Sequence, residues 1–395
     1  MLITPLHDSA SLLLLLLTFT FTPTHALTFP NLNLASAWAR RNNELATTAM
    51  NQTNQPTTNG TAAQNGTEFL WLSQDEYSGK TFFDRFSFFN DFDPTHGTVD
   101  YVNSTYAFAN RLAYVNDDGT IVMKGDDTTW LPEGQNRSSV RITSVAQYNT
   151  GLFILDLNRA PWGCVGAGQW PYTGEIDIIP KRTPGVHDNS HNQVTWHTGP
   201  GCFLTPETNY TGTLVNNNLN CDGNIPGNAG CGITEWSRAS YGPLFDQQGG
   251  GVFAMKWDET GIAVWSFYRS AIPRDIVAGT PNPANWGLPV ASLAPETCDP
   301  LTFFVNHSIV FGDWAGNSYA SSGCPGSCTD RLRDPNNFVN ASWSINWLKV
   351  YKKQFVLGRA SSAESGIMRD GVANAGFRWL VGMGVWAGVV FLYLS

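Results

Sequence analysis

The sequence is short of charge, and the charge it has is spread out. Asp, Glu, Lys and Arg make up only 14% of its 395 residues, and the formal net charge is −9. The chain has no cluster of basic residues, which is how proteins usually attract nucleic acids. We therefore expect no nucleic-acid partner.

The sequence also lacks any stretch with sustained helical periodicity and helix caps. From residue 69 to 353 it has short alternating or apolar runs, such as 120–123, 151–157 and 261–268, separated by Gly, Pro, Asn and Asp. Many short strands without helices predict one all-β sandwich domain over 69–353, with long loops.

Long apolar runs occur near the two ends. The run at 11–21 is too short to span a bilayer and predicts a signal peptide over 1–26, although no Lys or Arg precedes it. A polar linker at 354–378 contains small residues at 360–363, and an uncharged tail follows at 379–395. This order is typical of a cleaved glycosylphosphatidylinositol-anchor signal, with a retained transmembrane helix as the alternative.

Residues 27–68 are polar and low in complexity, which predicts a glycosylated linker. The Asn-x-Ser/Thr sequons stand at Asn51, Asn59, Asn65, Asn103, Asn136, Asn209, Asn306 and Asn340. Seven cysteines in a secreted chain should mostly pair, with one left over. Cys324 and Cys328 are close enough to bond, but each could equally pair elsewhere. We expect a secreted glycoprotein of the cell surface or cell wall, attached to the membrane only through its C-terminal signal.

The strongest functional signal is a pair of carboxylates two residues apart in an apolar strand. Glu175 and Asp177 lie in Gly-Glu-Ile-Asp-Ile-Ile-Pro at 174–180, and strand alternation turns both acids to one face. Burying one acid costs free energy, and aligning two costs more through like-charge repulsion, so such a pair favours a site that uses the charge. A retaining glycosidase needs a carboxylate nucleophile and an acid that protonates the leaving oxygen. An exposed strand whose acids face water gives the same pattern.

Four other residues are candidates for a sugar-binding cleft around these acids. His197, in Trp-His-Thr-Gly, could bind the carboxylate of Glu175 or a sugar hydroxyl, and Arg141 could pair with a carboxylate. Trp170 and Trp314 could stack on sugar rings. Each also has an ordinary structural interpretation, as a core residue for His197 and the tryptophans and as a solvated strand residue for Arg141.

From about residue 69 to 352 the chain resembles the laminarinases of glycoside hydrolase family 16, of the fungal endo-1,3(4)-β-glucanase type. The resemblance rests on an ordered series of motifs: Asp93-Pro94-Thr95-His96-Gly97, Ser139-Val140-Arg141-Ile142, Gly174-Glu175-Ile176-Asp177-Ile178-Ile179, His197-Thr198-Gly199, Asn216-Asn217-Asn218, Ser240-Tyr241-Gly242-Pro243, Gly312-Asp313-Trp314-Ala315-Gly316, Gly323-Cys324-Pro325-Gly326-Ser327-Cys328 and Val350-Tyr351.

This resemblance implies a β-jelly-roll sandwich of the concanavalin A-like kind, with an open carbohydrate-binding cleft. It implies retaining cleavage of β-1,3- or mixed β-1,3/1,4-glucan by a monomer. By position, Glu175 matches the nucleophile and Asp177 the assisting acid. Cleft positions that hold sugar are matched by Arg141, Trp170, His197 and Trp314. No metal or organic cofactor is implied.

The chain departs from the family pattern at the catalytic strand. The family continues Glu-Ile-Asp-Ile-Ile-Glu, where a bulge returns the last Glu to the catalytic face. Here that acid/base position holds Pro180, which cannot transfer a proton, and Lys181 is no substitute acid. The segment 165–169 is also shorter than in the family, and a Cys is missing before Gly312.

Three interpretations remain open after these departures. The chain is an endo-glucanase, active or impaired; or it is a non-catalytic glucan-binding protein of the cell wall; or coding boundaries near the shortened segments are mis-assigned. The intact Glu175 and Asp177 favour the first interpretation, and Pro180 favours the second.

Overall fold

The computed structural model divides the chain into two units, Met1–Thr58 and Asn59–Ser395, and the described residues lie in the second. These residues are 61–62, 68–93, 98–162, 175–179, 190–206, 209–312 and 327–356. The expected signal peptide, the C-terminal tail and most of both linkers lie outside them. Gln354 and Phe355, predicted to begin the second linker, instead continue the last strand of the domain, where they pair with Leu70 and Phe69. Among the described residues, no helix has the length and apolar character needed to cross a membrane.

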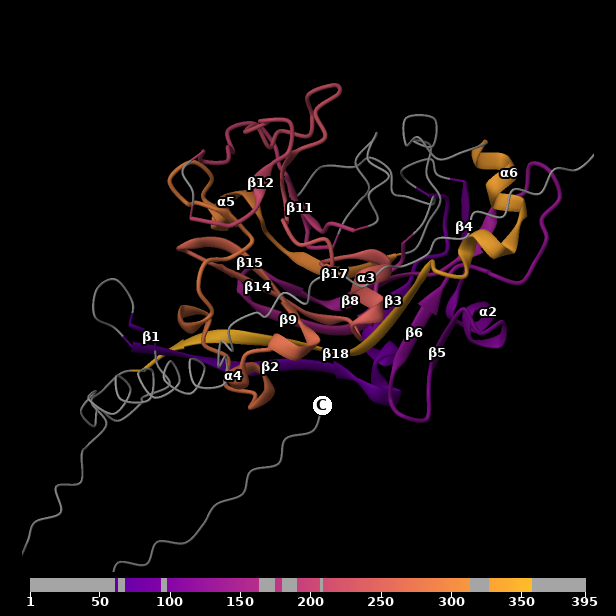
Figure 1. Ribbon diagram of the computed structural model, residues 1–395, viewed down its shortest axis with the longest axis horizontal. Coiled ribbons are helices and arrows are strands. Elements are labelled where there is room, and N and C mark those ends of the chain that lie inside the picture. Colours follow the sequence, from indigo (N-terminus) through magenta and orange to yellow (C-terminus); the bar gives the residue numbers. More distant parts are fainter. Residues whose placement is uncertain are drawn as a thin grey trace, which may run out of the picture. The chain divides into compact units, whose positions relative to one another are not determined.

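A nine-stranded antiparallel sheet forms one layer of the domain (Figure 1). Its main order is β1 (Thr61–Ala62), β2 (Glu68–Ser78), β18 (Ser342–Phe355), β9 (Gly151–Arg159), β14 (Gly251–Asp258), β15 (Gly261–Tyr268) and β16 (Ala291–Leu293). Two further strands, β6 (Ile121–Lys124) and β5 (Ala113–Val115), extend from β18. The first long strand, β2, pairs along β18, the last strand, so the two ends of the domain meet in one layer.

Smaller sheets form the other layer. A four-stranded sheet has the order β10 (Glu175–Asp177), β11 (Gln193–His197), β13 (Cys231–Thr234) and β12 (Thr213–Leu214). A three-stranded sheet has the order β17 (His307–Gly312), β8 (Arg141–Tyr148) and β3 (Phe86–Phe88), and β4 (Val99–Tyr101) pairs in parallel with β7 (Arg137–Ser139).

The main core lies between these layers. It unites Phe253 and Val264 of the nine-stranded sheet with Ile142, Trp196 and Ile233 of the smaller sheets. A second cluster covers the opposite face of the large sheet, where Ile276 of α4 (Arg274–Val277) packs. Because both faces are covered, β9 and β14 are buried along most of their length rather than at alternating positions. The predicted all-β sandwich is confirmed.

Short helices in the loops correct the expectation that the domain has none. Besides α4, they are α2 (Ser104–Ala109), α3 (Gly242–Gln247), α5 (Pro300–Phe303), α6 (Cys328–Arg333), η1 (Gly79–Thr81), η2 (Phe83–Arg85), η3 (Arg269–Ala271), η4 (Pro283–Asn285) and η6 (Pro335–Phe338). Each has one or two turns, which is too short to show helical periodicity. Local caps stabilise several of them; the Asn103 side chain, for example, accepts a hydrogen bond from the Tyr106 amide at the start of α2.

Candidate active site

The ladder between β10 and β11 places the two acids. Glu175 pairs with His197, Ile176 with Trp196, and Asp177 with Thr195. Directly paired residues share a face, so Glu175, Asp177 and His197 lie on one side of the sheet. Ile176 and Trp196 point the other way and join the main core. Both acids are half-buried rather than exposed.

Asp177 and His197 are in direct contact. Nε2 of His197 lies 3.2 Å from Oδ2 of Asp177, and the two side chains are only 10% and 14% exposed. With its proton on Nε2, His197 donates this hydrogen bond to the carboxylate. It therefore orients Asp177, which is next to the expected nucleophile Glu175 on the same face.

One nitrogen or oxygen from each of Glu175, Asp177 and His197 lies within 4.8 Å of the others. Two carboxylates this close disfavour each other's charge, and the hydrogen bond from His197 offsets part of that cost. An imidazole with two carboxylates is also a donor set that a divalent metal ion can use. The expectation that no metal takes part therefore stays a prediction.

Arg141 lies on a different sheet, at the start of β8. Its guanidinium carbon is 5.3 Å from the centre of the Phe89 ring and 5.9 Å from that of Tyr101, within the range of cation–π attraction. In the ladder it pairs with Gly312, the last residue of β17. These aromatic contacts fix the guanidinium, and its expected pairing with a carboxylate or sugar stays a prediction.

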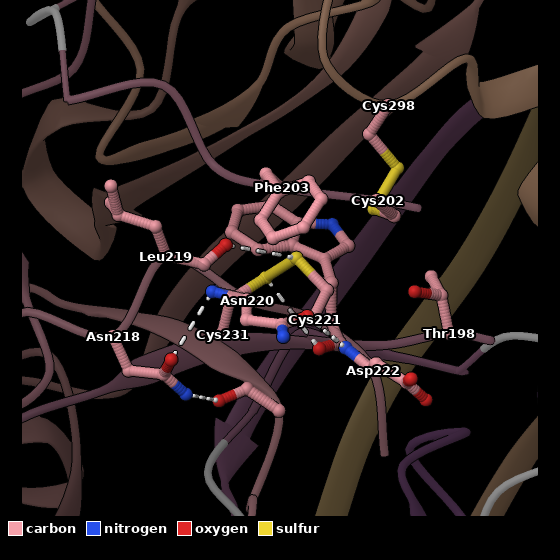
Figure 2. The surroundings of a disulfide bond; sticks show 12 residues. Thr198, Cys202, Phe203, Asn218, Leu219, Asn220, Cys221, Asp222, Cys231 and Cys298 are labelled. Carbon is pink, nitrogen blue, oxygen red and sulfur yellow. Dashed lines mark hydrogen bonds between the residues drawn. A yellow bond between two sulfur atoms is a disulfide. The ribbon is translucent and has the colours of Figure 1, made fainter. Parts of the chain in front are cut away.

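Three of the sequence-predicted positions fall outside the described residues: Trp170, Pro180 and Trp314. Their placement relative to Glu175 is therefore not described. The same is true of Cys164 and Cys324 and of the side chain of Cys328. The remaining four cysteines form the disulfides Cys202–Cys298 and Cys221–Cys231, which confirms the expected use of disulfides (Figure 2).

A buried carboxyl group that the sequence analysis missed lies at the other end of the same small sheet. Glu235 directly follows β13, is 7% exposed, and accepts a hydrogen bond of 2.5 Å from Oγ of Ser266. Burial raises the pKa of Glu235 to about 7. Ser266 is in β15 of the opposing layer, 31 residues away, so nothing local in the sequence signals the contact.

The comparison with protein families decides what kind of domain this is. The model of XgeA-like catalytic domains of glycoside hydrolase family 16 matches residues 86–351. The chain belongs to glycoside hydrolase family 16. The stated resemblance is thereby confirmed, and so is the prediction of a glycoside hydrolase.

Curated relatives agree with this assignment. A probable glycosidase of Schizosaccharomyces pombe is 42% identical over 292 residues, which cover 70% of this chain and 68% of that protein. A probable endo-1,3(4)-β-glucanase of Aspergillus flavus is 35% identical over 70% of this chain and 44% of its own length. The chain thus spans about two thirds of the first protein and less than half of the second.

Solved structures confirm the jelly-roll fold. Laminarinase 16A of Phanerochaete chrysosporium, described with two β-glucans in its donor and acceptor sites, is 37% identical, with a TM-score of 0.65. The match covers 71% of this chain and 99% of that one. An elongating family 16 β-1,3-glucosyltransferase is 36% identical, with a TM-score of 0.64 over 71% of this chain and 100% of that one.

Proposed function

We propose that this domain cleaves β-1,3- or mixed β-1,3/1,4-glucan with retention of configuration, using Glu175 as the nucleophile. The observation that carries the proposal is the grouping of Glu175, Asp177 and His197 on one sheet face of a family 16 domain. Relatives named endo-1,3(4)-β-glucanase and a laminarinase described with bound β-glucans support the choice of substrate.

In this proposal, a carboxylate oxygen of Glu175 attacks the anomeric carbon as the bond to the leaving oxygen breaks. A covalent glycosyl ester forms, and water hydrolyses it in a second step. Asp177, held by the hydrogen bond from His197, orients Glu175 and adjusts its charge. Arg141, Trp170, His197 and Trp314 hold the sugar chain.

This mechanism also needs a group that protonates the leaving oxygen. Pro180 occupies the acid/base position and has no proton to give. Loss of a general acid lowers the rate by roughly 10²- to 10⁴-fold. We therefore infer an impaired hydrolase on natural glucan, whose nucleophile and sugar-binding residues are intact. A chain that binds glucan without cleaving it is the alternative.

The proposed setting is outside the cell. The apolar run near the start, the sequons and the uncharged tail at 379–395 support a secreted, glycosylated protein held at the surface or wall by a lipid anchor. β-Glucan of the wall would then be the substrate, and the protein would act as a monomer.

Two substrates and one added nucleophile test the proposal. Purified protein is given laminarin, and separately a β-1,3-linked disaccharide with a dinitrophenyl leaving group, which needs no protonation. We expect cleavage of the aryl substrate, little cleavage of laminarin, and loss of both in Glu175→Ala. Azide should accelerate turnover and yield a glycosyl azide of retained configuration, because azide attacks the glycosyl ester without help from a base.

Each other outcome has a distinct meaning. If laminarin is cleaved at rates ordinary for a glycosidase, another residue supplies the proton and the inferred impairment is wrong. If neither substrate is cleaved but laminarin binds, the chain is a glucan-binding relative.

Sugar transfer is a second candidate, because the matched β-1,3-glucosyltransferase is 36% identical to this chain and is matched over its full length. A sugar hydroxyl would then replace water in the second step. Products longer than the starting oligosaccharide would reveal it.

A further inference from the structure

The ring of His197 has one nitrogen on Asp177, and its other nitrogen faces a loop closed by a disulfide. That loop runs from Cys221 to Cys231, and the bond between these two cysteines joins its ends. Figure 2 shows the disulfide with Thr198, the residue after His197, nearby. The loop ends at β13, where Cys231 pairs with Trp196, the residue before His197.

Gly230 makes the contact with the ring. A Cβ atom built on it would lie 2.6 Å from Nδ1 and 2.9 Å from Cε1 of His197, and 2.6 Å from the carbonyl oxygen of Trp196. Real side chains do not approach this closely, so any other residue at 230 must move the ring or the strand. The φ angle of Gly230, +78°, also favours glycine.

The loop that carries Gly230 is held by side-chain amides. The Asn218 side chain donates hydrogen bonds to the Gly230 carbonyl and to Oδ1 of Asn228, both 2.8 Å long. The Asn228 side chain in turn donates to the carbonyls of Asn220 and Asp222. The backbone of Gly230 therefore has little freedom to move away from His197.

The loop is also bonded to the strand that carries His197. The Thr198 amide donates to the Cys221 carbonyl at 2.9 Å, and the Gly223 amide donates to the Thr198 carbonyl at 3.0 Å. Both ends of the loop thus lie against the residues that flank His197. A displacement of the loop would reach the imidazole directly.

We propose that Gly230, fixed by the Cys221–Cys231 loop, is a positioning residue that keeps Nε2 of His197 on Asp177. The absence of a side chain at 230 leaves room for the Nδ1 edge of the ring, and the loop blocks rotation away from the carboxylate. The consequence for catalysis rests on the proposed function of Glu175 and Asp177.

The chain provides a matched control for the test. Gly227 lies in the same loop with a φ of +81°, but a Cβ there would meet nothing within 4 Å. Gly227→Ala and Gly230→Ala thus introduce the same kind of backbone strain, and only the second introduces a clash, with His197 and with the Trp196 carbonyl beside it.

The first measurement is the NMR spectrum of the histidine rings, with the His197 signals identified by their loss in His197→Asn. We expect Gly230→Ala to shift these signals and Gly227→Ala to leave them in place. Unchanged His197 signals in a folded Gly230→Ala protein would overturn the proposal. This readout does not depend on activity, so it stands even if the proposed hydrolysis fails.

The second measurement is hydrolysis of the aryl disaccharide. Gly230→Ala should lower kcat by about 10- to 100-fold, as expected for a small misplacement of a catalytic assembly, with less change in KM. Added to His197→Ala, which removes the ring, it should cost almost nothing more. An equal loss with and without the ring would show a general structural effect and overturn the positioning role.

If Gly230→Ala does not fold, Asn218→Ala provides the same test without a left-handed backbone. It releases the Gly230 carbonyl, so it should shift the same His197 signals by a smaller amount. Unshifted signals in that variant would contradict the proposal.

Discussion

The two ends of the four-stranded sheet hold carboxyl groups in opposite settings. At one end Glu175 and Asp177 are half-buried and share the outward face with His197, whose imidazole contacts Asp177. At the other end Glu235 pairs through its backbone with Asn192 and points between the layers, where Ser266 is its hydrogen-bond donor. One small sheet thus supplies acids to its outer face, from β10, and to the interior, from the residue after β13.

The difference shows that a raised pKa does not by itself identify a catalytic acid. Glu235 has the neutral, protonated character at mild pH that a glycosidase acid needs, because burial raises its pKa to about 7. It faces the core, however, on the side of the sheet opposite to Glu175, so it cannot reach the leaving oxygen of a sugar bound beside Glu175. The missing acid at Pro180 is therefore not replaced by Glu235.

Replacing Glu175 and Glu235 one at a time is the strongest test of this comparison. Glu175→Gln should reduce hydrolysis of the aryl disaccharide by on the order of 10⁴-fold or more, as expected when a nucleophile is lost. Glu235→Gln is the matched control and should leave kcat/KM within about twofold of wild type. A large loss in the control, in a protein that is fully folded, would contradict the separation of the two sites.

Restoring an acid at position 180 is the next test. Pro180→Glu should increase laminarin hydrolysis by roughly 10²- to 10⁴-fold, because the alkoxide leaving group then receives a proton. The dinitrophenyl disaccharide should gain much less in its first step. Equal gains on the two substrates would mean that the substitution acts on folding or binding instead.

A smaller effect is expected from the contact between Asp177 and His197. Asp177→Asn keeps the shape but removes the charge, and a hydrogen bond to a charged group contributes about 1.5–3 kcal/mol. We expect kcat on the aryl disaccharide to fall by about 10- to 100-fold, and His197→Asn in the same protein to add little further loss. Fully additive losses would show that the two side chains act independently.

The outward face of β10 was predictable because it depends on local alternation. The period of two in Glu-Ile-Asp-Ile is enough to separate Glu175 and Asp177 from Ile176, and the structure has that separation. The all-β sandwich followed from the same kind of pattern. The short helices did not, because caps such as Asn103 act over one turn and leave no periodic signal.

The surroundings of the site were beyond sequence reasoning because they depend on contacts across the fold. His197 and Asp177 are 20 residues apart in the sequence and meet only because their strands pair. Gly230 contacts His197 only because β13 lies beside β11. In the sequence, a glycine in a loop rich in Asn and Gly cannot be told from an ordinary turn residue. The residues alone suggested that His197 binds Glu175 or a sugar hydroxyl, whereas in the structure His197 contacts Asp177.

Glu235→Gln should have the smallest effect on the rate of hydrolysis. Its clear effect should be on the pH dependence of stability. Burial raises the pKa of Glu235 to about 7 in the folded chain, above the 4.5 of a carboxyl group exposed to water. Between these two values the unfolded chain loses the proton first and the folded chain retains it, so the free energy of unfolding falls as pH rises. The loss begins near pH 4.5, is complete above about 7, and totals about 3 kcal/mol.

Denaturant unfolding at pH 5 and pH 8 measures this dependence. The Gln side chain keeps an oxygen that can accept the hydrogen bond from Ser266, but it does not ionise. The wild-type protein should therefore lose stability between pH 5 and pH 8, and the Gln variant should not. The difference in free energy of unfolding, variant minus wild type, should rise by about 1–3 kcal/mol from pH 5 to pH 8. An equal difference between the two proteins at both pH values would mean that Glu235 ionises as readily inside the fold as in water. The contrast between the interior acid and the outward pair would then disappear.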